Sequence, residues 1–508
     1  MENLPRIIES ARVPLDIPIR LYLNDHCVDG HAVIPAVEAM EILAQAVKRF
    51  RPGTDVTAMT GLQFDKFLYL APEADRLSAF CDISVYENGD VKAVMTTRTQ
   101  SKKAALARVK AHAALIFPQQ APLIPKLALD LAASLEGVCF SVQAEKIYPD
   151  LIPFGLSYRN VAMLRVASQS AIAEIRTPVD ETGAERPQQL GSPFALDAAF
   201  HAACVWGQRF AGTVAFPVAM DRCRVHAQPR AGKTYFAHVI HVRTDSGLLT
   251  FDLRIYDRDG CLCVACSGVR MKDVSGGKRL PPQWISIPAA ADQTTDQMAA
   301  GCDALTVIEL ITVAPFADKV LSADESKRFE NMSDRRRRSF LAARLACKRL
   351  SRILSGNDTE TDPRDITTVF PDKASPCCPL TDGRSAYACS VSHDDRFAVA
   401  VASTGRVGVD VEKMSERVLK SRSLFMSAQE EALGRASRLG EIETAVRIWS
   451  IKEAVTKALD ITLTDAWHRV QVRSVGSSES RFQVDDQHPS TAVHAVVGQH
   501  VFTLVCRL

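Results

Sequence analysis

The chain has 508 residues, and its 61 basic and 59 acidic residues leave a formal charge of +2. This length predicts two to four domains, and the near balance of charge argues against nucleic-acid partners and against a broadly basic membrane surface. No run approaches the roughly 18 apolar residues of a membrane span, and the first residues lack a secretory pattern. The 14 cysteines are spread along the chain. We therefore expect a cytoplasmic protein with reduced thiols and no membrane or nucleic-acid partner.

Two amphipathic helices are predicted in the first 275 residues. One covers residues 35–50 and begins at a proline, a favoured first helical position; the other covers residues 193–206. Each is followed by segments with strand character, such as residues 79–85 and 235–242, and residues 257–260 form a hairpin signal. One long helix wrapped by an antiparallel sheet, occurring twice, predicts a double hot-dog fold.

Two motifs in this region carry chemistry. The stretch from His26 to Pro35 matches HxxxGxxxxP and resembles the N-terminal signature of polyketide synthase dehydratase domains. Asp197, followed four positions later by His201, resembles the second signature of that family, in which a glutamine commonly replaces the histidine. Residues 154–159 and 216–220 are similar to two further family segments, GYxYGPxF and LPFSW. The likeness covers roughly residues 10–275 and implies one hot-dog half over 1–120 and another over 121–275.

The resemblance implies dehydration of a β-hydroxyacyl thioester, which requires a base at the α-carbon and an acid for the departing hydroxyl. His26 is the candidate base, because imidazole titrates near neutral pH. Asp197 is the candidate acid, provided that an apolar site keeps it partly protonated. His201 shares a helix face with Asp197 and either orients the carboxyl or, when charged, lowers its pKa. Gly30 would let backbone approach the thioester, and the helix starting at Pro35 would offer N–H groups to its carbonyl oxygen.

A linker is expected over residues 276–304, where the sequence is polar, rich in turn residues at its start and without a clear period. Beyond it, a valine-rich strand places Gly408, Asp410 and Glu412 on one face, because side chains alternate along a strand. A helix follows in which Glu453 and Lys457 are four residues apart and share a face. Three carboxylates and a lysine are thus predicted to converge on one divalent cation and one phosphate.

These two segments resemble the GxDxE and WxxKEA signatures of 4′-phosphopantetheinyl transferases of the larger, surfactin-synthetase type. Residues 390–393 lie where that family carries its Ser-His motif, and residues 321–328 and 339–344 are similar to its N-terminal half. The resemblance runs over residues 305–508 and implies a two-lobed α+β fold, with two similar halves.

The resemblance also implies roles. Asp410, Glu412 and Glu453 would hold Mg²⁺, which prefers carboxylates, phosphate oxygens and water. Glu453 would further assist deprotonation of the incoming serine, directly or through water. Lys457 would meet phosphate as a point charge and act in catalysis. Ser392 and His393 would contact a phosphate of coenzyme A.

Further basic residues suit the nucleotide and its 3′-phosphate. Arg344 and Lys373 are the candidates for coenzyme A contact. The run of four arginines at residues 335–338 is either a solvated helix face or a direct coenzyme contact, and the sequence leaves both interpretations open.

Taken together, the motifs predict an α+β bifunctional enzyme of polyketide or polyunsaturated fatty acid biosynthesis. One part would transfer 4′-phosphopantetheine from coenzyme A to a carrier-protein serine, and the other would dehydrate β-hydroxyacyl thioesters on that carrier. The expected partners are acyl carrier protein domains of a multidomain synthase, and dehydratase domains of this type often pair as homodimers. Two alternatives remain for the first half: a non-catalytic carrier-docking module, or a domain that shapes cyclisation.

Overall fold

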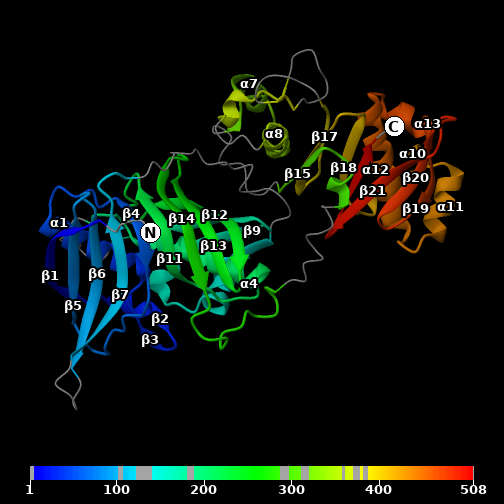
Figure 1. The fold of residues 1–508 in the computed structure, drawn as a ribbon. Helices are drawn as coiled ribbons and strands as arrows, with labels where there is room; N and C mark the ends of the chain where they lie inside the picture. Colours follow the sequence, from blue (N-terminus) through cyan, green and yellow to red (C-terminus); the bar gives the residue numbers. More distant parts are fainter. Residues whose placement is uncertain are drawn as a thin grey trace. The chain divides into compact units, whose positions relative to one another are not determined.

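The computed structural model describes residues 5–100, 107–121, 140–179, 188–286, 297–309, 320–356, 361–369, 378–380 and 387–506. The described residues before 287 form one compact unit, and those after 296 form a second (Figure 1). In the described part of the chain, no helix is long and apolar enough to cross a membrane.

The first unit is built on a twelve-stranded antiparallel sheet in the spatial order β1-β5-β6-β7-β4-β11-β14-β13-β12-β10-β9-β8. Its strands are β1 (Ile7–Pro18), β4 (Ala58–Gln63), β5 (Arg76–Tyr86), β6 (Val91–Gln100), β7 (Ala107–Phe117), β8 (Phe140–Gln143), β9 (Val161–Val166), β10 (Ser170–Arg176), β11 (Phe216–Val225), β12 (Thr234–Asp245), β13 (Leu248–Asp257) and β14 (Leu262–Lys272). A separate two-stranded ribbon joins β2 (Cys27–Val28) to β3 (His31–Ala32).

Each half of this sheet packs on one long helix. Helix α1 (Ala36–Phe50) contacts β5, β6 and β7, and helix α4 (Phe194–Phe210) contacts β9, β10, β12 and β13. Pairing of β4 with β11 joins the halves. The predicted double hot-dog fold is therefore confirmed. Pro35 is the N-cap of α1 rather than its first helical residue, and α4 extends beyond the predicted end at Trp206.

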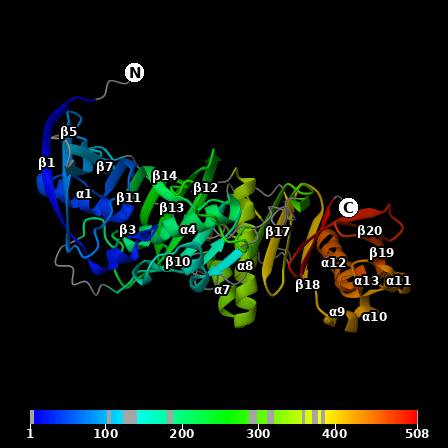
Figure 2. The same cartoon turned by 90° about the horizontal axis from the view of Figure 1, so that it is seen from below.

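The second unit has two lobes, each with a sheet and a long helix (Figure 2). The first lobe has the sheet β15-β17-β16 and helix α8; the second has the sheet β18-β22-β21-β20-β19 and helix α12. The bounds are β15 (Ala304–Glu309), β16 (Ala388–His393), β17 (Phe397–Ser403), β18 (Val407–Lys413), β19 (Val470–Val475), β20 (Glu479–Val484), β21 (Ser490–Val497), β22 (His500–Cys506), α7 (Ala323–Glu330), α8 (Asp334–Leu354), α9 (Arg417–Lys420), α10 (Arg422–Phe425), α11 (Ala428–Ala436), α12 (Glu441–Leu459) and α13 (Leu463–Arg469). This arrangement confirms the predicted α+β class.

The same local device occurs in both lobes. Helix α7 begins with a capping box of Ser322 and Glu325, and Glu325 also pairs with a buried lysine of α8, Lys348. Helix α11 likewise begins with a capping box, whose residue Glu430 pairs with Lys452 of α12. In a capping box the serine and the glutamate satisfy each other's free backbone N–H groups. Here the same carboxylate also fixes the long helix that follows, so the two lobes are built alike.

Candidate active sites

In the first unit, the two predicted catalytic residues come together from separate elements. His26 caps the end of a short 3₁₀ turn and immediately precedes β2, while Asp197 lies in the first turn of α4. Both are buried, and Nε2 of His26 is 4.0 Å from Oδ1 of Asp197. Gly30 lies in the β2–β3 turn with a φ of +79°, which a glycine adopts without strain. The backbone conformation of this turn therefore explains why a glycine is present at position 30.

The pair opens into a cavity of about 1070 Å³. His26, Phe154, Asp197 and His201 line it, together with Ala36, the first residue of α1. Further lining comes from four basic side chains: Lys66, Lys110, Arg270 and Lys272. A cavity of this size, mostly apolar with a few polar groups, suits a small-molecule or acyl ligand.

His201 is held between Asp197 and a tyrosine. Its Nε2 lies 3.1 Å from Oδ2 of Asp197, out of line for a hydrogen bond, and its Nδ1 is 2.9 Å from the hydroxyl of Tyr148. That hydroxyl accepts from the backbone N–H of Val161 at 3.3 Å, which leaves its hydrogen for Nδ1 of His201. This arrangement favours a proton on Nε2, facing the carboxyl. No motif in the sequence pointed to Tyr148.

The pKa values of His26 and Asp197 are both lowered, and for Asp197 this is the opposite of the expectation. Burial lowers the pKa of His26 to about 4, against the opposing charge of Asp197, so the imidazole is neutral at pH 7 and able to accept a proton. Burial alone would raise the pKa of Asp197, but His201 and His26 outweigh it and the pKa is lowered. The expectation that an apolar site keeps Asp197 partly protonated was therefore wrong. His201 makes the largest contribution to this lowering, and its two considered roles, orienting the carboxyl and lowering its pKa, both stay predictions.

In the second unit, strand β18 and helix α12 bring the predicted carboxylates together. Asp410 and Glu412 lie on β18, while Glu453 and Lys457 lie on α12. The two elements approach closely at Gly408, where a Cβ atom would lie 1.8 Å from the carbonyl oxygen of Ala454 in α12. A side chain at this position would force the helix away from the strand. Glycine at the start of the GxDxE motif therefore permits the packing that forms the site.

Asp410 is the centre of this site. Its Oδ1 accepts from Ser392 Oγ at 2.7 Å and from Lys457 Nζ at 2.8 Å. Its Oδ2 is buried and has no hydrogen-bond partner among the described residues. Glu412 accepts from the indole N–H of Trp449 at 3.2 Å. A buried carboxylate oxygen without a donor is costly unless a cation or water occupies the space before it.

The carboxylates act on one another as like charges. Burial raises the pKa of Glu412 to about 7, with further contributions from Asp410 and Glu453. Burial and the charge of Asp410 also raise the pKa of Glu453. A bound cation reverses this repulsion, and three carboxylate oxygens are ligands that Mg²⁺ accepts. The residues therefore fit the predicted divalent metal.

Basic groups gather beside the carboxylates. Ser392 also accepts from Lys457 at 2.9 Å. Burial lowers the pKa of the neighbouring His393, and the charges of Lys457 and Arg344 act in the same direction. The charges of two cationic side chains, Lys457 and Arg344, thus reach His393. Lys373, the other predicted coenzyme contact, lies outside the described residues.

The arginine run at 335–338 is partly structural. The Arg337 guanidinium donates to the carbonyl oxygens of Phe329 and Glu330 and pairs with Asp334 at 3.5 Å. This member of the run joins the end of α7 to the start of α8. The coenzyme interpretation loses support at Arg337.

A second group of potential metal ligands consists of Asp394, Asp395 and His500, whose ligand atoms all lie within 4.8 Å of one another. His500 Nδ1 is 2.5 Å from Asp394 Oδ2, and Asp395 pairs with Lys413 at 2.8 Å. Each of these groups already has a protein partner. The carboxylates on β18 and α12 differ in one respect, because Oδ2 of Asp410 is buried and has no partner among the described residues.

Comparison with known families gives two matches. Residues 406–505 match the 4′-phosphopantetheinyl transferase superfamily, and residues 144–281 match the polyketide synthase dehydratase N-terminal domain. Both are families of enzymes. The chain carries a polyketide synthase dehydratase domain joined to a domain of the 4′-phosphopantetheinyl transferase superfamily.

Individual relatives are distant. Polyketide synthase PksM of Bacillus subtilis (strain 168) is 19% identical over 280 residues, which cover 52% of this chain and 6% of that protein. The dehydratase domain of a mycocerosic acid synthase-like polyketide synthase is 18% identical, with 54% of this chain and 94% of that one covered and a TM-score of 0.45. The dehydratase domain from the CurF module of Curacin polyketide synthase is 21% identical, with coverages of 53% and 96% and a TM-score of 0.44.

Proposed function

We propose that the protein is a bifunctional enzyme that transfers 4′-phosphopantetheine from coenzyme A to a carrier-protein serine and dehydrates β-hydroxyacyl groups on such a carrier. The observation that carries the transferase assignment is the convergence of Asp410, Glu412, Glu453 and Lys457 from β18 and α12, with one buried oxygen of Asp410 left without a donor. Acyl carrier protein domains of a polyketide or polyunsaturated fatty acid synthase are the proposed partners. Tethering both sites in one chain raises their effective concentration around one carrier.

In the transfer, the serine oxygen forms a bond to the phosphorus that bears pantetheine. The bond from that phosphorus to the bridging oxygen breaks, and adenosine 3′,5′-bisphosphate leaves. Glu453 accepts the serine proton, directly or through water. Lys457, Ser392 and His393 bind phosphate oxygens. Asp410, Glu412 and Glu453 would hold Mg²⁺, which would supply charge neutralisation on the pyrophosphate.

In the dehydration, His26 takes the proton from the α-carbon and the hydroxyl leaves the β-carbon with a proton delivered through Asp197, so that a C=C bond and water form. Because the pKa of Asp197 is lowered, the carboxyl must receive that proton before it can give it. His26 can supply it: the proton that its Nε2 takes from the α-carbon passes to Oδ1 of Asp197, 4.0 Å away, and from there to the departing hydroxyl.

Transfer is tested by incubating the protein with coenzyme A, Mg²⁺ and an apo carrier protein and measuring carrier mass. The parent should add the phosphopantetheine mass, and Asp410→Ala should reduce the rate by at least about a hundredfold, since it removes a metal ligand and the partner of Lys457. Glu416→Ala, an exposed carboxylate just beyond β18, is the matched control and should retain the parent rate. Full activity in Asp410→Ala would refute the metal assignment.

Dehydration is tested with a β-hydroxyacyl-carrier substrate and product analysis. His26→Ala should lose at least about a hundredfold in rate, because the general base is removed. His31→Ala, an exposed histidine in β3, is the matched control and should be unaffected. No dehydration by the parent would favour the carrier-docking alternative, and a cyclised product dependent on His26 would favour the cyclisation alternative.

A further inference from the structure

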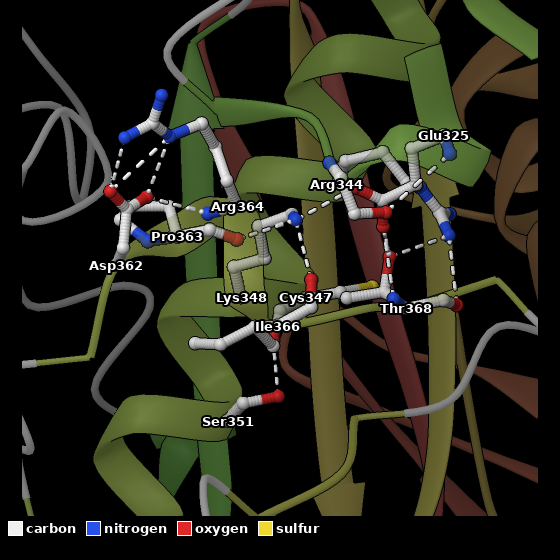
Figure 3. A network of polar contacts seen from close by, with 11 residues as sticks. Glu325, Arg344, Cys347, Lys348, Ser351, Asp362, Pro363, Arg364, Ile366 and Thr368 are labelled. Carbon is white, nitrogen blue, oxygen red and sulfur yellow. Dashed lines mark hydrogen bonds and ion pairs between the residues drawn. The ribbon is translucent and has the colours of Figure 1, made fainter. Parts of the chain in front are cut away.

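A buried polar network lies in the first lobe of the second unit (Figure 3). The ammonium of Lys348 is 2.7 Å from Oε2 of Glu325, and the two side chains are 1% and 0% exposed. Lys348 also donates to the carbonyl oxygens of Pro363 and Ile366 at 2.7 and 2.5 Å. A buried ion pair is tolerated when further hydrogen bonds satisfy its remaining groups. Here those bonds tie helix α8 to the segment over residues 363–368.

Thr368 connects this ion pair to Arg344. Its backbone N–H and its hydroxyl both donate to Oε1 of Glu325, at 2.9 and 2.7 Å. Its hydroxyl oxygen accepts from Nη1 of Arg344 at 3.0 Å, and its carbonyl oxygen accepts from the same atom at 3.2 Å. A hydroxyl has one hydrogen, and a carboxylate can only accept. The hydrogen is therefore committed to Glu325, and the lone pairs of the oxygen face the guanidinium.

Arg344 itself is buried, and one of its donors lacks a partner among the described residues. Its guanidinium carbon lies 5.2 Å from the centre of the Phe340 ring, and its Nε has no hydrogen-bond partner among the described residues. Within that same set, no carboxylate pairs with it. Its charge acts on His393 of the candidate phosphate site. Burying a cation without a neutralising partner costs folding free energy unless an anion binds beside it.

We propose that Thr368 is a positioning residue, which uses the Glu325–Lys348 ion pair to hold the Arg344 guanidinium in place for a phosphate group of coenzyme A. The inference rests on the proposed transferase function. Lys348 keeps Glu325 ionised, Glu325 orients the Thr368 hydroxyl, and that oxygen orients Arg344. The lowered pKa of Glu325 agrees with this order: burial opposes ionisation, but Lys348, Thr368 and Ser322 outweigh it.

The test replaces the hydroxyl while keeping the shape of the side chain. Thr368→Val should raise the KM for coenzyme A about tenfold with kcat within twofold of the parent, because one hydrogen bond to a charged group is lost away from the reacting atoms. Thr368→Ser keeps the oxygen and should restore the parent KM. The matched control is Thr306→Val. Thr306 lies buried in β15, and its hydroxyl donates at 3.0 Å to the carbonyl oxygen of Ala346 in α8, the helix that also carries Arg344. It should lose stability without a change in KM.

The dissociation constant of coenzyme A, measured by calorimetry without a carrier, separates this inference from the proposed function. A parent that binds coenzyme A but transfers nothing would overturn the function, and the tenfold weakening in Thr368→Val would still support the network. Equal affinities for Thr368→Val and Thr306→Val, or a fall in kcat without a change in KM, would overturn the role of Thr368. Failure of the parent to bind coenzyme A would overturn both.

Discussion

Asp410 and Glu412 are two residues apart on one strand face, yet their surroundings differ. The ammonium of Lys457 and the hydroxyl of Ser392 compensate Asp410. Glu412 has only the indole N–H of Trp449, and burial beside Asp410 raises its pKa to about 7. In the absence of metal, Glu412 therefore holds a proton below about pH 7. Metal binding displaces that proton, so Mg²⁺ affinity should rise with pH up to about 7.

The raised pKa of Glu412 predicts a pH-dependent stability with a definite sign. The folded, metal-free protein holds a proton that the unfolded chain releases near its usual pKa of 4.5, so stability falls as pH rises from about 4.5 to 7. The loss is on the order of 2–3 kcal/mol and should be reversed by excess Mg²⁺. The measurement is denaturant unfolding in chelator at pH 5 and pH 8. Glu412→Gln should lack this component, and an identical pH dependence in that variant would contradict the prediction.

Sequence reasoning placed together those candidate site residues that follow a periodic pattern. Alternation along a strand placed Asp410 beside Glu412, and the helical repeat placed Glu453 beside Lys457. Tyr148 and Thr368 were missed because their partners, His201, Glu325 and Arg344, are distant in sequence and are brought near only by tertiary packing. The error at Asp197 has the same origin. Its pKa depends on the exact positions of two histidines, which spacing alone does not give.

At the level of elements, helix α12 is held in place by a buried charge next to the proposed catalytic residue Glu453. Lys452 precedes Glu453, and its ammonium donates to the carbonyl oxygen of Phe425 and to Oε2 of Glu430 at 2.5 and 3.0 Å. Glu430 also accepts from the backbone N–H of Val472 in β19 at 2.8 Å. These bonds connect α12 to α11 and the sheet, so they determine how α12 presents Glu453 to β18.

Breaking this pair should be costly. Lys452→Met leaves the Glu430 carboxylate buried without its cation, and we expect a loss of about 3–5 kcal/mol in the free energy of unfolding, measured with denaturant. Lys413→Met is the control, because its pair with Asp395 is about half exposed on both sides and should contribute no more than about 1 kcal/mol. The double variant Lys452→Met/Glu430→Gln should recover part of the loss. Similar losses for the two single variants would contradict the prediction.

Over the whole molecule, each unit has apolar cores of its own. One cluster of buried residues lies within Leu15–Ile285, and two others lie within Phe425–Val505 and Met298–Leu504. The helix and strand periods predicted the double hot-dog fold of the first unit, whereas the two-lobed α+β fold of the second was implied by its family motifs. The spatial order of the twelve strands could not be predicted from the sequence, because strand pairing depends on contacts between distant segments.

Separate cores predict separable activities in the intact chain. Asp410→Ala should abolish transfer and leave dehydration of a pre-loaded carrier unchanged, and His26→Ala should do the reverse. Both rates are measured on the same preparations, with mass analysis of the carrier. Loss of both activities in either variant would show that the two units depend on one another for folding or catalysis.

The close approach at Gly408 has a consequence for which cation the protein selects. The absence of one side chain sets the spacing between β18 and α12, and hence the span between carboxylates on the strand and the carboxylate on the helix. Mg²⁺ requires oxygens at about 2.0–2.1 Å, whereas Ca²⁺ accepts 2.3–2.6 Å. In the proposed metal site, Gly408 touches no ligand but sets this spacing. We therefore expect the metal preference of the site to depend on the missing side chain as well as on the acids themselves.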